Sequence, residues 1–195
     1  PSGRTRLIQR GHELEVLAEI VDSAAAGAPW IVALEGPGGI GKTRLLSEAR
    51  GSAERAGLRV LSARGSEREQ RLPFGIVDQI FAGIIDARAD PSRAAGGQPG
   101  GAETDTSLAT FASLLDVTER LAEEGPLVLA IDDLHLADEP SLGYLGYLAR
   151  RVTRMPITIL ATLRPFERSA NAALLSALVG DPLAVSIRPA PLTES

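Results

Sequence analysis

Short apolar runs alternate with longer amphipathic segments along most of the chain. Each run has a length and a content of β-branched residues typical of a strand. One of them, Leu127-Val-Leu-Ala-Ile131, is apolar at every position, as expected of a strand covered on both faces. We therefore predict five strands, at residues 30–34, 58–63, 127–131, 157–163 and 183–187.

The segments between these runs repeat apolar residues every three or four positions, which predicts helices. Leu14, Leu17 and Val21 give the first helix its apolar stripe, and Pro140 suits the first turn of a later one. Ser169 is placed to cap the last helix at its amino end. The predicted helices cover residues 12–27, 42–56, 74–87, 108–122, 140–152 and 170–179.

Regular alternation of strands and helices is typical of a parallel sheet sandwiched between helices. We therefore predict one α/β domain over residues 1–195, with a five-stranded parallel sheet. Residues 1–29 supply a helix that leads into the core, and residues 90–106, rich in glycine and proline, are expected to form a flexible loop. Lid and effector domains are not recognisable in this sequence.

Composition and charge exclude several classes of function. The net charge is −5 and the pI about 5.1, so the chain lacks the positive field that nucleic acids attract. No apolar run reaches the roughly 18 residues of a membrane span, and no secretion leader is visible, so we expect a cytoplasmic location. With no cysteine and only two histidines, a metal must be held by oxygen, which favours Mg²⁺.

One lysine stands among twenty basic residues, and it lies in a glycine-rich motif. The motif fits G-x-x-x-x-G-K-[ST] and joins a predicted strand to a predicted helix, which is the context of a phosphate-binding loop, or P-loop. Glycines let the backbone amides point at phosphate oxygens, the lysine reaches the β- and γ-phosphates, and the threonine hydroxyl binds Mg²⁺. The predicted nucleotide-binding residues are Gly36, Pro37, Gly38, Gly39, Ile40, Gly41, Lys42 and Thr43.

Two adjacent aspartates follow the buried strand at 127–131, at the sheet edge where ligands bind in open α/β sheets. Asp132 is predicted to orient Mg²⁺ through a coordinated water, and Asp133 to polarise the attacking water. Arg164 lies just past the fourth strand and is a candidate for the γ-phosphate, although a solvated surface arginine is an equal alternative.

Other polar side chains have less specific signals. His135 is interpreted as a structural loop residue, and Arg150 with Arg151 as a solvated helix end. Guanine-specific P-loop proteins read their base with Asn-Lys-x-Asp, which needs a lysine other than Lys42. The sequence has none, so ATP is favoured over GTP.

The motifs together resemble the ATPase domain of large ATP-binding regulators of the LuxR family. The resemblance rests on Glu35-Gly-Pro-Gly-Gly-Ile-Gly-Lys-Thr-Arg-Leu-Leu46, on Leu72-Pro-Phe-Gly-Ile-Val77 and on Ala161-Thr-Leu-Arg-Pro165. Its most specific part is Ile131-Asp-Asp-Leu-His-Leu-Ala-Asp-Glu-Pro-Ser-Leu142.

This resemblance implies an AAA-related, STAND-like P-loop NTPase whose fourth strand lies between the first and the third. It implies that ATP and ADP with Mg²⁺ act as a switch through slow hydrolysis. It also implies self-association of the full-length protein and DNA binding through a C-terminal domain outside this chain. Arg10 is implied near the base, Arg44 among the nucleotide contacts and Arg164 as the γ-phosphate sensor. The alternatives are an ATPase module linked to a cyclase or protein kinase, or a P-loop small-molecule kinase.

Overall fold

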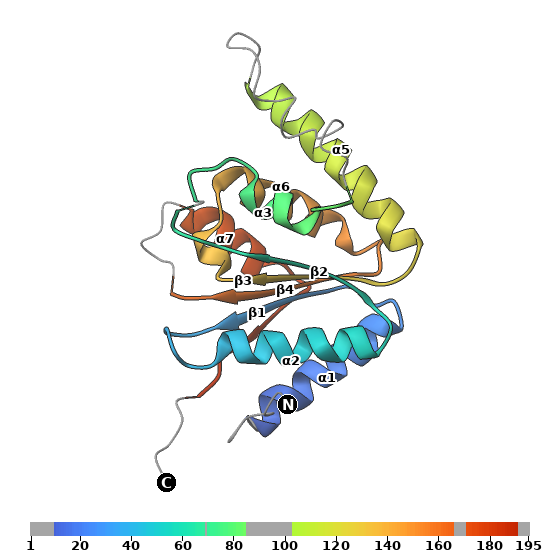
Figure 1. The fold of residues 1–195 in the computed structure, drawn as a ribbon, viewed down its shortest axis with the longest axis vertical. Coiled ribbons are helices and arrows are strands. Elements are labelled where there is room, and N and C mark those ends of the chain that lie inside the picture. Colours follow the sequence, from blue (N-terminus) through green and yellow to red (C-terminus); the bar gives the residue numbers. More distant parts are fainter. Residues whose placement is uncertain (1–9, 69, 85–102, 166–170, 191–195) are drawn as a thin grey trace.

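The computed structural model describes residues 10–68, 70–84, 103–165 and 171–190. A five-stranded parallel sheet lies between two layers of helices, which confirms the predicted α/β fold (Figure 1). The strands are β1 (Trp30–Glu35), β2 (Arg59–Arg64), β3 (Leu127–Asp132), β4 (Ile157–Leu163) and β5 (Ala184–Ile187).

The order of the strands across the sheet is β2-β3-β4-β1-β5. The fourth strand thus lies between the first and the third, as the resemblance implied. Every neighbouring pair is parallel, so all five carboxyl ends meet at one edge of the sheet. The loops that follow β1, β3 and β4 are therefore neighbours, and these loops carry the predicted site residues.

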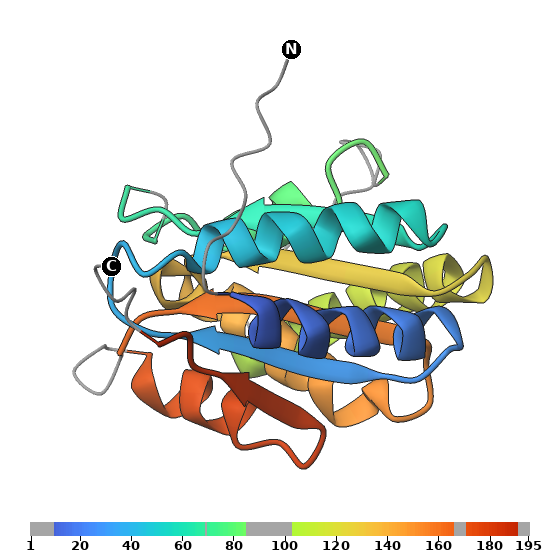
Figure 2. The same ribbon diagram turned by 90° about the horizontal axis from the view of Figure 1, so that it is seen from below.

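Helices cover both faces of the sheet. Helices α1 (Gly11–Ala25) and α2 (Lys42–Arg55) lie side by side on one face, as Figure 2 shows. In the part of the chain that the structure describes, the other face carries α3 (Gly75–Ile80), α5 (Glu103–Glu123), α6 (Glu139–Val152) and α7 (Ala172–Val179) (Figure 1). Among the described residues, no helix is long and apolar enough to cross a membrane.

Each face of the sheet has its own hydrophobic core, because alternate strand residues point to opposite faces. Val32, Leu34 and Val128 pack against α1 and α2, whereas Leu129 and Ile131 pack against α3, α5, α6 and α7. All six residues of β3 are buried. Tyr144 and Tyr147 also pack there, since both rings contact Phe111 in the second core.

The largest differences between the structure and the predicted elements are in three places. The helix expected over 74–87 ends at Ile80, because a turn with Gly83 in a left-handed conformation follows it, and residues 85–87 lie outside the described residues. The loop expected over 90–106 ends earlier, because residues 103–106 already belong to α5, and residues 90–102 are not described. Ser169 also lies outside the described residues, and Asn171 stands at the N-cap of α7.

A buried carboxylate organises the loop that leads from β3 to α6. Asp138 caps α6 by accepting a hydrogen bond from the Ser141 amide at 2.8 Å. The same carboxylate accepts the amides of Phe74 at 2.8 Å and Ile76 at 3.4 Å, at the start of α3. Asp138 therefore fixes the loop after the acidic pair to a segment more than sixty residues earlier in the chain.

We expect Asp138→Ala to lower the free energy of unfolding by about 2–4 kcal/mol, because it leaves buried amides without their acceptor. Urea unfolding followed by circular dichroism measures this loss. Glu139→Ala is the matched control, since Glu139 is exposed in the first turn of the same helix and should cost less than about 1 kcal/mol. Equal losses in the two variants would contradict the assigned role of Asp138.

Candidate functional site

The loop between β1 and α2 has the backbone of an anion-binding turn. Gly39 and Gly41 adopt left-handed conformations with φ of 79° and 97°, which residues with side chains rarely adopt. Gly41 is also the N-cap of α2, so the first amides of this helix face the loop without a capping side chain. The partial positive charge of the helix end is therefore directed into the loop.

Lys42 lies under this loop and is almost fully buried. Its Nζ donates hydrogen bonds to the carbonyl oxygens of Gly36 at 2.7 Å and Pro37 at 2.8 Å. Burial, together with the positive charge of Arg164, lowers the pKa of Lys42 below its ordinary value. The ammonium group is thus held at the centre of the loop by contacts to its backbone.

Asp132 joins the loop to two strands. Its carboxylate lies 3.0 and 3.1 Å from the Thr43 hydroxyl, which donates to it from the first turn of α2. The hydroxyl of Thr162, on β4, donates to the same carboxylate at 2.7 Å. Thr43 and Asp132, which were each predicted as Mg²⁺ ligands, thus lie in hydrogen-bond contact. Two oxygen ligands fit Mg²⁺, which takes few protein ligands when phosphates supply others.

Asp133 has a backbone conformation unusual for a residue with a side chain, with φ 51° and ψ 44°. Its amide donates to Thr162 Oγ1 at 2.7 Å, which fixes this conformation. One carboxylate oxygen lies 3.9 Å from Arg164 Nε, and the other lies 3.6 Å from a guanidinium nitrogen of Arg64. The second acidic side chain therefore lies between two arginines.

Arg164 follows β4 and reaches the phosphate loop. A Cβ atom added to Gly38 would lie 3.4 Å from one of its guanidinium nitrogens, so the guanidinium lies next to the loop at Gly38. About half of the Arg164 side chain remains exposed (53%), which leaves donors open to the cavity. The arginine is thus beside the loop, as required of a residue that contacts the γ-phosphate.

These groups surround a cavity of about 500 Å³. Four of its lining side chains are cationic and one is a carboxylate, so the cavity favours an anion with several charges. The lining residues are Gly38, Gly39, Gly41, Lys42, Thr43, Arg44, Ser47, Arg64, Asp133 and Arg164.

The structure places Arg10 against the outside of the phosphate loop. Its guanidinium is buried and donates to Ile40 O at 2.8 Å, to Ala190 O and to Glu13 at 2.9 Å. Arg10 therefore ties the start of α1 to the loop and to the segment after β5. Its predicted position near the nucleotide base stays a prediction.

Two other predicted residues adjoin the site. Arg44 lines the cavity and forms an ion pair with Glu48 at 2.9 Å, one turn along α2. His135 lies in a short 3₁₀ helix (Leu134–Leu136), and burial lowers its pKa below the ordinary 6.5. Burial therefore favours the uncharged imidazole, and the structural role of His135 stays a prediction.

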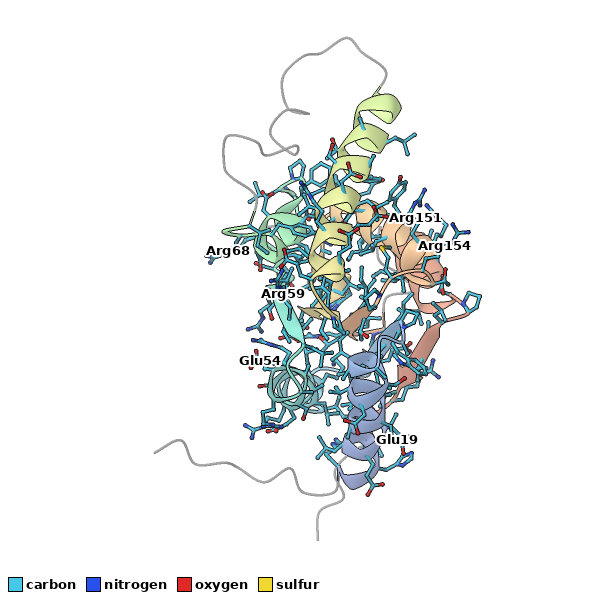
Figure 3. All side chains as sticks on the ribbon, turned by 90° about the vertical axis from the view of Figure 1, so that its right-hand side faces the viewer. Glu19, Glu54, Arg59, Arg68, Arg151 and Arg154 are labelled. Atoms are coloured by element: carbon cyan, nitrogen blue, oxygen red, sulfur yellow. The ribbon has the colours of Figure 1, made fainter. Side chains whose placement is uncertain are left out.

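Arg151 lies at the carboxyl end of α6, where its guanidinium stacks on the Tyr147 ring at 3.5 Å from the centroid. Figure 3, which views the amino ends of the strands, shows Arg151 and Arg154 there, on the side opposite the phosphate loop. This position fits the interpretation of Arg150 and Arg151 as a helix end.

Two site residues were not predicted from the sequence. Thr162 lies inside the apolar run of β4, where a single threonine is usually a packing residue. Arg64 lies one residue beyond the predicted end of the second strand. The register of β2 on β3 pairs Arg64 with Asp132. A second strand predicted to end at Arg64 would have placed this arginine at the same sheet edge as the acidic pair.

Comparison with known proteins adds a family. Residues 6–160 match a family model described as the AAA ATPase domain. An uncharacterised protein of Rhizobium meliloti is 25% identical over 190 residues, which cover 82% of this chain and 18% of that protein. The chain thus spans less than a fifth of the length of that relative.

Several solved structures are similar to this chain at a low level. ORC2 of Aeropyrum pernix, solved in ADPNP and ADP complexes, is 16% identical, with a TM-score of 0.48 over 94% of this chain and 49% of its own. A chain of Drosophila ORC bound to AT-rich DNA and Cdc6 is 18% identical, with a TM-score of 0.49 over 96% of this chain and 61% of its own. DnaA of Aquifex aeolicus, bound to AMPPCP, is 18% identical, with a TM-score of 0.48 over 93% of this chain and 48% of its own.

We expect Lys42→Ala to abolish ATP binding or weaken it severely, because the loop loses the only ammonium group in the chain. Isothermal titration calorimetry measures the affinity, and thermal melting checks that the fold is retained. Arg55→Ala is the matched control, since it removes an exposed cation from the other end of α2. Unchanged ATP affinity in the Lys42 variant would contradict the phosphate-loop assignment.

Proposed function

This chain belongs to the AAA ATPase domain family, and we propose that it binds ATP with Mg²⁺ and hydrolyses it slowly to ADP and phosphate. The observation that carries the proposal is the hydrogen bond between Thr43 and Asp132, beside a cavity lined by Lys42, Asp133 and Arg164. A phosphate loop, an acidic pair and a terminal arginine converge there from three neighbouring strands.

Each residue has a role that follows from its position. The amides of the loop and Lys42 hold the phosphates, and Thr43 with Asp132 hold Mg²⁺. A metal held by these two residues would supply positive charge to the phosphates. Asp133 accepts a hydrogen bond from the attacking water and orients it toward the γ-phosphorus, while Arg164 donates to the γ-oxygens.

We further propose that this ATPase acts as a nucleotide switch in a larger, cytoplasmic bacterial transcription regulator of the LuxR family. The run Ile131-Asp-Asp-Leu-His-Leu-Ala-Asp-Glu-Pro-Ser-Leu142 supports this, as does the greater length of the Rhizobium relative. In such a protein ATP favours self-association, and DNA is bound by a separate C-terminal domain. A switch of this kind needs contacts that distinguish ATP from ADP, since contacts common to both shift no equilibrium.

Arg164→Ala should weaken binding of a non-hydrolysable ATP analogue by about tenfold or more, because charged hydrogen bonds to the γ-oxygens are lost. The affinity for ADP should stay nearly unchanged. Paired calorimetric titrations of both nucleotides with Mg²⁺ measure the difference, and Arg154→Ala is the control for an exposed arginine far from the loop (Figure 3). Equal losses for both nucleotides would make Arg164 a general phosphate contact.

Asp133→Asn should keep the affinity for ATP within a few-fold of the parent and stop release of phosphate. Asparagine keeps the shape of aspartate, but its neutral amide is a poor acceptor for the proton of the attacking water. A phosphate-release assay under single-turnover conditions measures the rate. A variant that hydrolyses ATP as fast as the parent would remove Asp133 from this role.

A further inference from the structure

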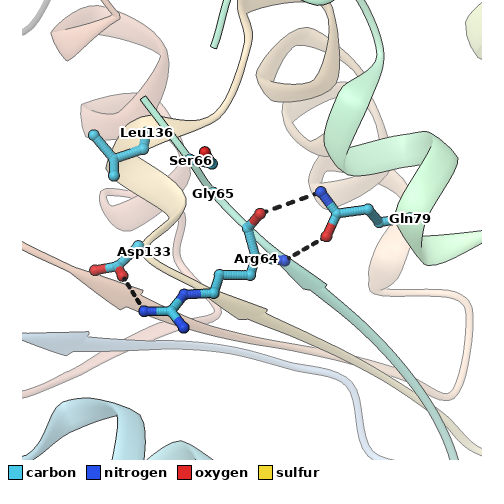
Figure 4. A pocket seen from close by; sticks show the side chains of 6 residues that line it. All are labelled: Arg64, Gly65, Ser66, Gln79, Asp133 and Leu136. Carbon is cyan, nitrogen blue, oxygen red and sulfur yellow. Dashed lines mark hydrogen bonds and ion pairs between the residues drawn. The ribbon is translucent and has the colours of Figure 1, made fainter. Parts of the chain in front are cut away.

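A second arginine faces the acidic pair from the opposite side to Arg164. Arg64 ends β2, the edge strand next to β3. Its Nε lies 3.6 Å from Asp132, and another of its guanidinium nitrogens lies 3.6 Å from Asp133. Figure 4 shows the side chain extending from the strand to Asp133. The function described above gives Arg64 no role.

The backbone at Arg64 is fixed by contacts on both sides. The Gln79 side chain, from α3, accepts the Arg64 amide at 2.9 Å and donates to the Arg64 carbonyl at 3.2 Å (Figure 4). The next amide, of Gly65, donates to Asp132 O at 2.8 Å. A Cβ atom at Gly65 would collide with the Asp133 carbonyl, so only glycine permits this close approach. The backbone of Arg64 is therefore fixed next to the acidic pair.

The guanidinium itself is held loosely. Both of its contacts to carboxylates are longer than the 2.7–2.9 Å, roughly, of a charge-assisted hydrogen bond. The side chain is 69% exposed and lines the same cavity as the phosphate loop. A guanidinium has five donors in a rigid fork, so Arg64 can bind a phosphate while it still faces the carboxylates.

The two arginines flank a carboxylate that would repel a bound γ-phosphate. A γ-phosphate that enters the cavity meets the negative carboxylate of Asp133, and this repulsion must be offset. Arg164 lies at one oxygen of that carboxylate and Arg64 at the other, each at the end of a strand that neighbours β3. Two cations on opposite sides can hold the γ-phosphate next to the acidic pair, where one cation would draw it to its own side.

We propose that Arg64 is a second γ-phosphate-binding residue, which works with Arg164 to distinguish ATP from ADP. The inference rests on the proposed function, because it requires that the cavity binds ATP. It goes beyond that function by assigning the recognition of the third phosphate to two strand ends, β2 and β4, rather than one. Gln79, on α3, is hydrogen-bonded to the backbone of Arg64 at the end of β2. A contact between Arg64 and the nucleotide is therefore linked directly to α3.

The test is a pair of calorimetric titrations, with a non-hydrolysable ATP analogue and with ADP, both in the presence of Mg²⁺. Arg64→Ala should weaken the ATP analogue by about fivefold or more and leave ADP within about twofold, so the ratio of the two affinities falls. Arg64→Lys should restore part of the loss, because it keeps the charge but not the fork. The double variant with Arg164→Ala should lose more selectivity than either single variant.

Arg59→Ala is the matched control, because Arg59 is an exposed arginine at the amino end of the same strand (Figure 3). It should change neither affinity. An unchanged ratio of affinities in Arg64→Ala would overturn the inference, and so would tighter binding of both nucleotides, which would make Arg64 only a counter-ion of the acidic pair. If the parent chain binds neither nucleotide, the proposed function fails first, which keeps the two failures distinct.

Discussion

The buried carboxylate of Asp132 is the constraint on which the site depends. A carboxylate loses its hydration when it is buried, and its charge is tolerated only where donors replace the lost water. Here the donors are two hydroxyls, Thr43 from the phosphate loop and Thr162 from β4. The three groups meet only because β4 lies between β1 and β3. The site therefore depends on this strand order.

The neighbouring carboxylate shows how the same strand end serves a second purpose. The backbone of Asp133 is held in a left-handed conformation by Thr162, which turns its side chain between Arg64 and Arg164. One threonine on β4 therefore orients both acidic residues. Strand ends of a parallel sheet are rigid, so the positions of the two carboxylates and of the backbone at both arginines are set before any ligand arrives. This preorganisation suits a site that must distinguish ATP from ADP by the γ-phosphate.

Much of this was predictable from the sequence, and the exceptions have physical causes. The phosphate loop and the acidic pair follow from local motifs, and the fold follows from the alternation of strands and helices. Thr162 was missed because its importance arises from the strand order, which periodicity does not contain. Arg64 was missed because the predicted second strand ended one residue early. The helix at 74–87 was predicted too long, because its apolar spacing continues through residues that form a turn around Gly83.

We propose that one anion site spans the carboxyl ends of β1, β2, β3 and β4. Hydrogen–deuterium exchange, measured on the unaltered chain with and without Mg²⁺ and an ATP analogue, tests this claim most directly. It predicts slower exchange on binding in the phosphate loop and first turn of α2, in residues 132–136, and at the ends of β2 and β4. Exchange at the amino ends of the strands and in the last turn of α6 should not change. Protection confined to those distant segments, or protection of the phosphate loop without residues 132–136, would contradict the account.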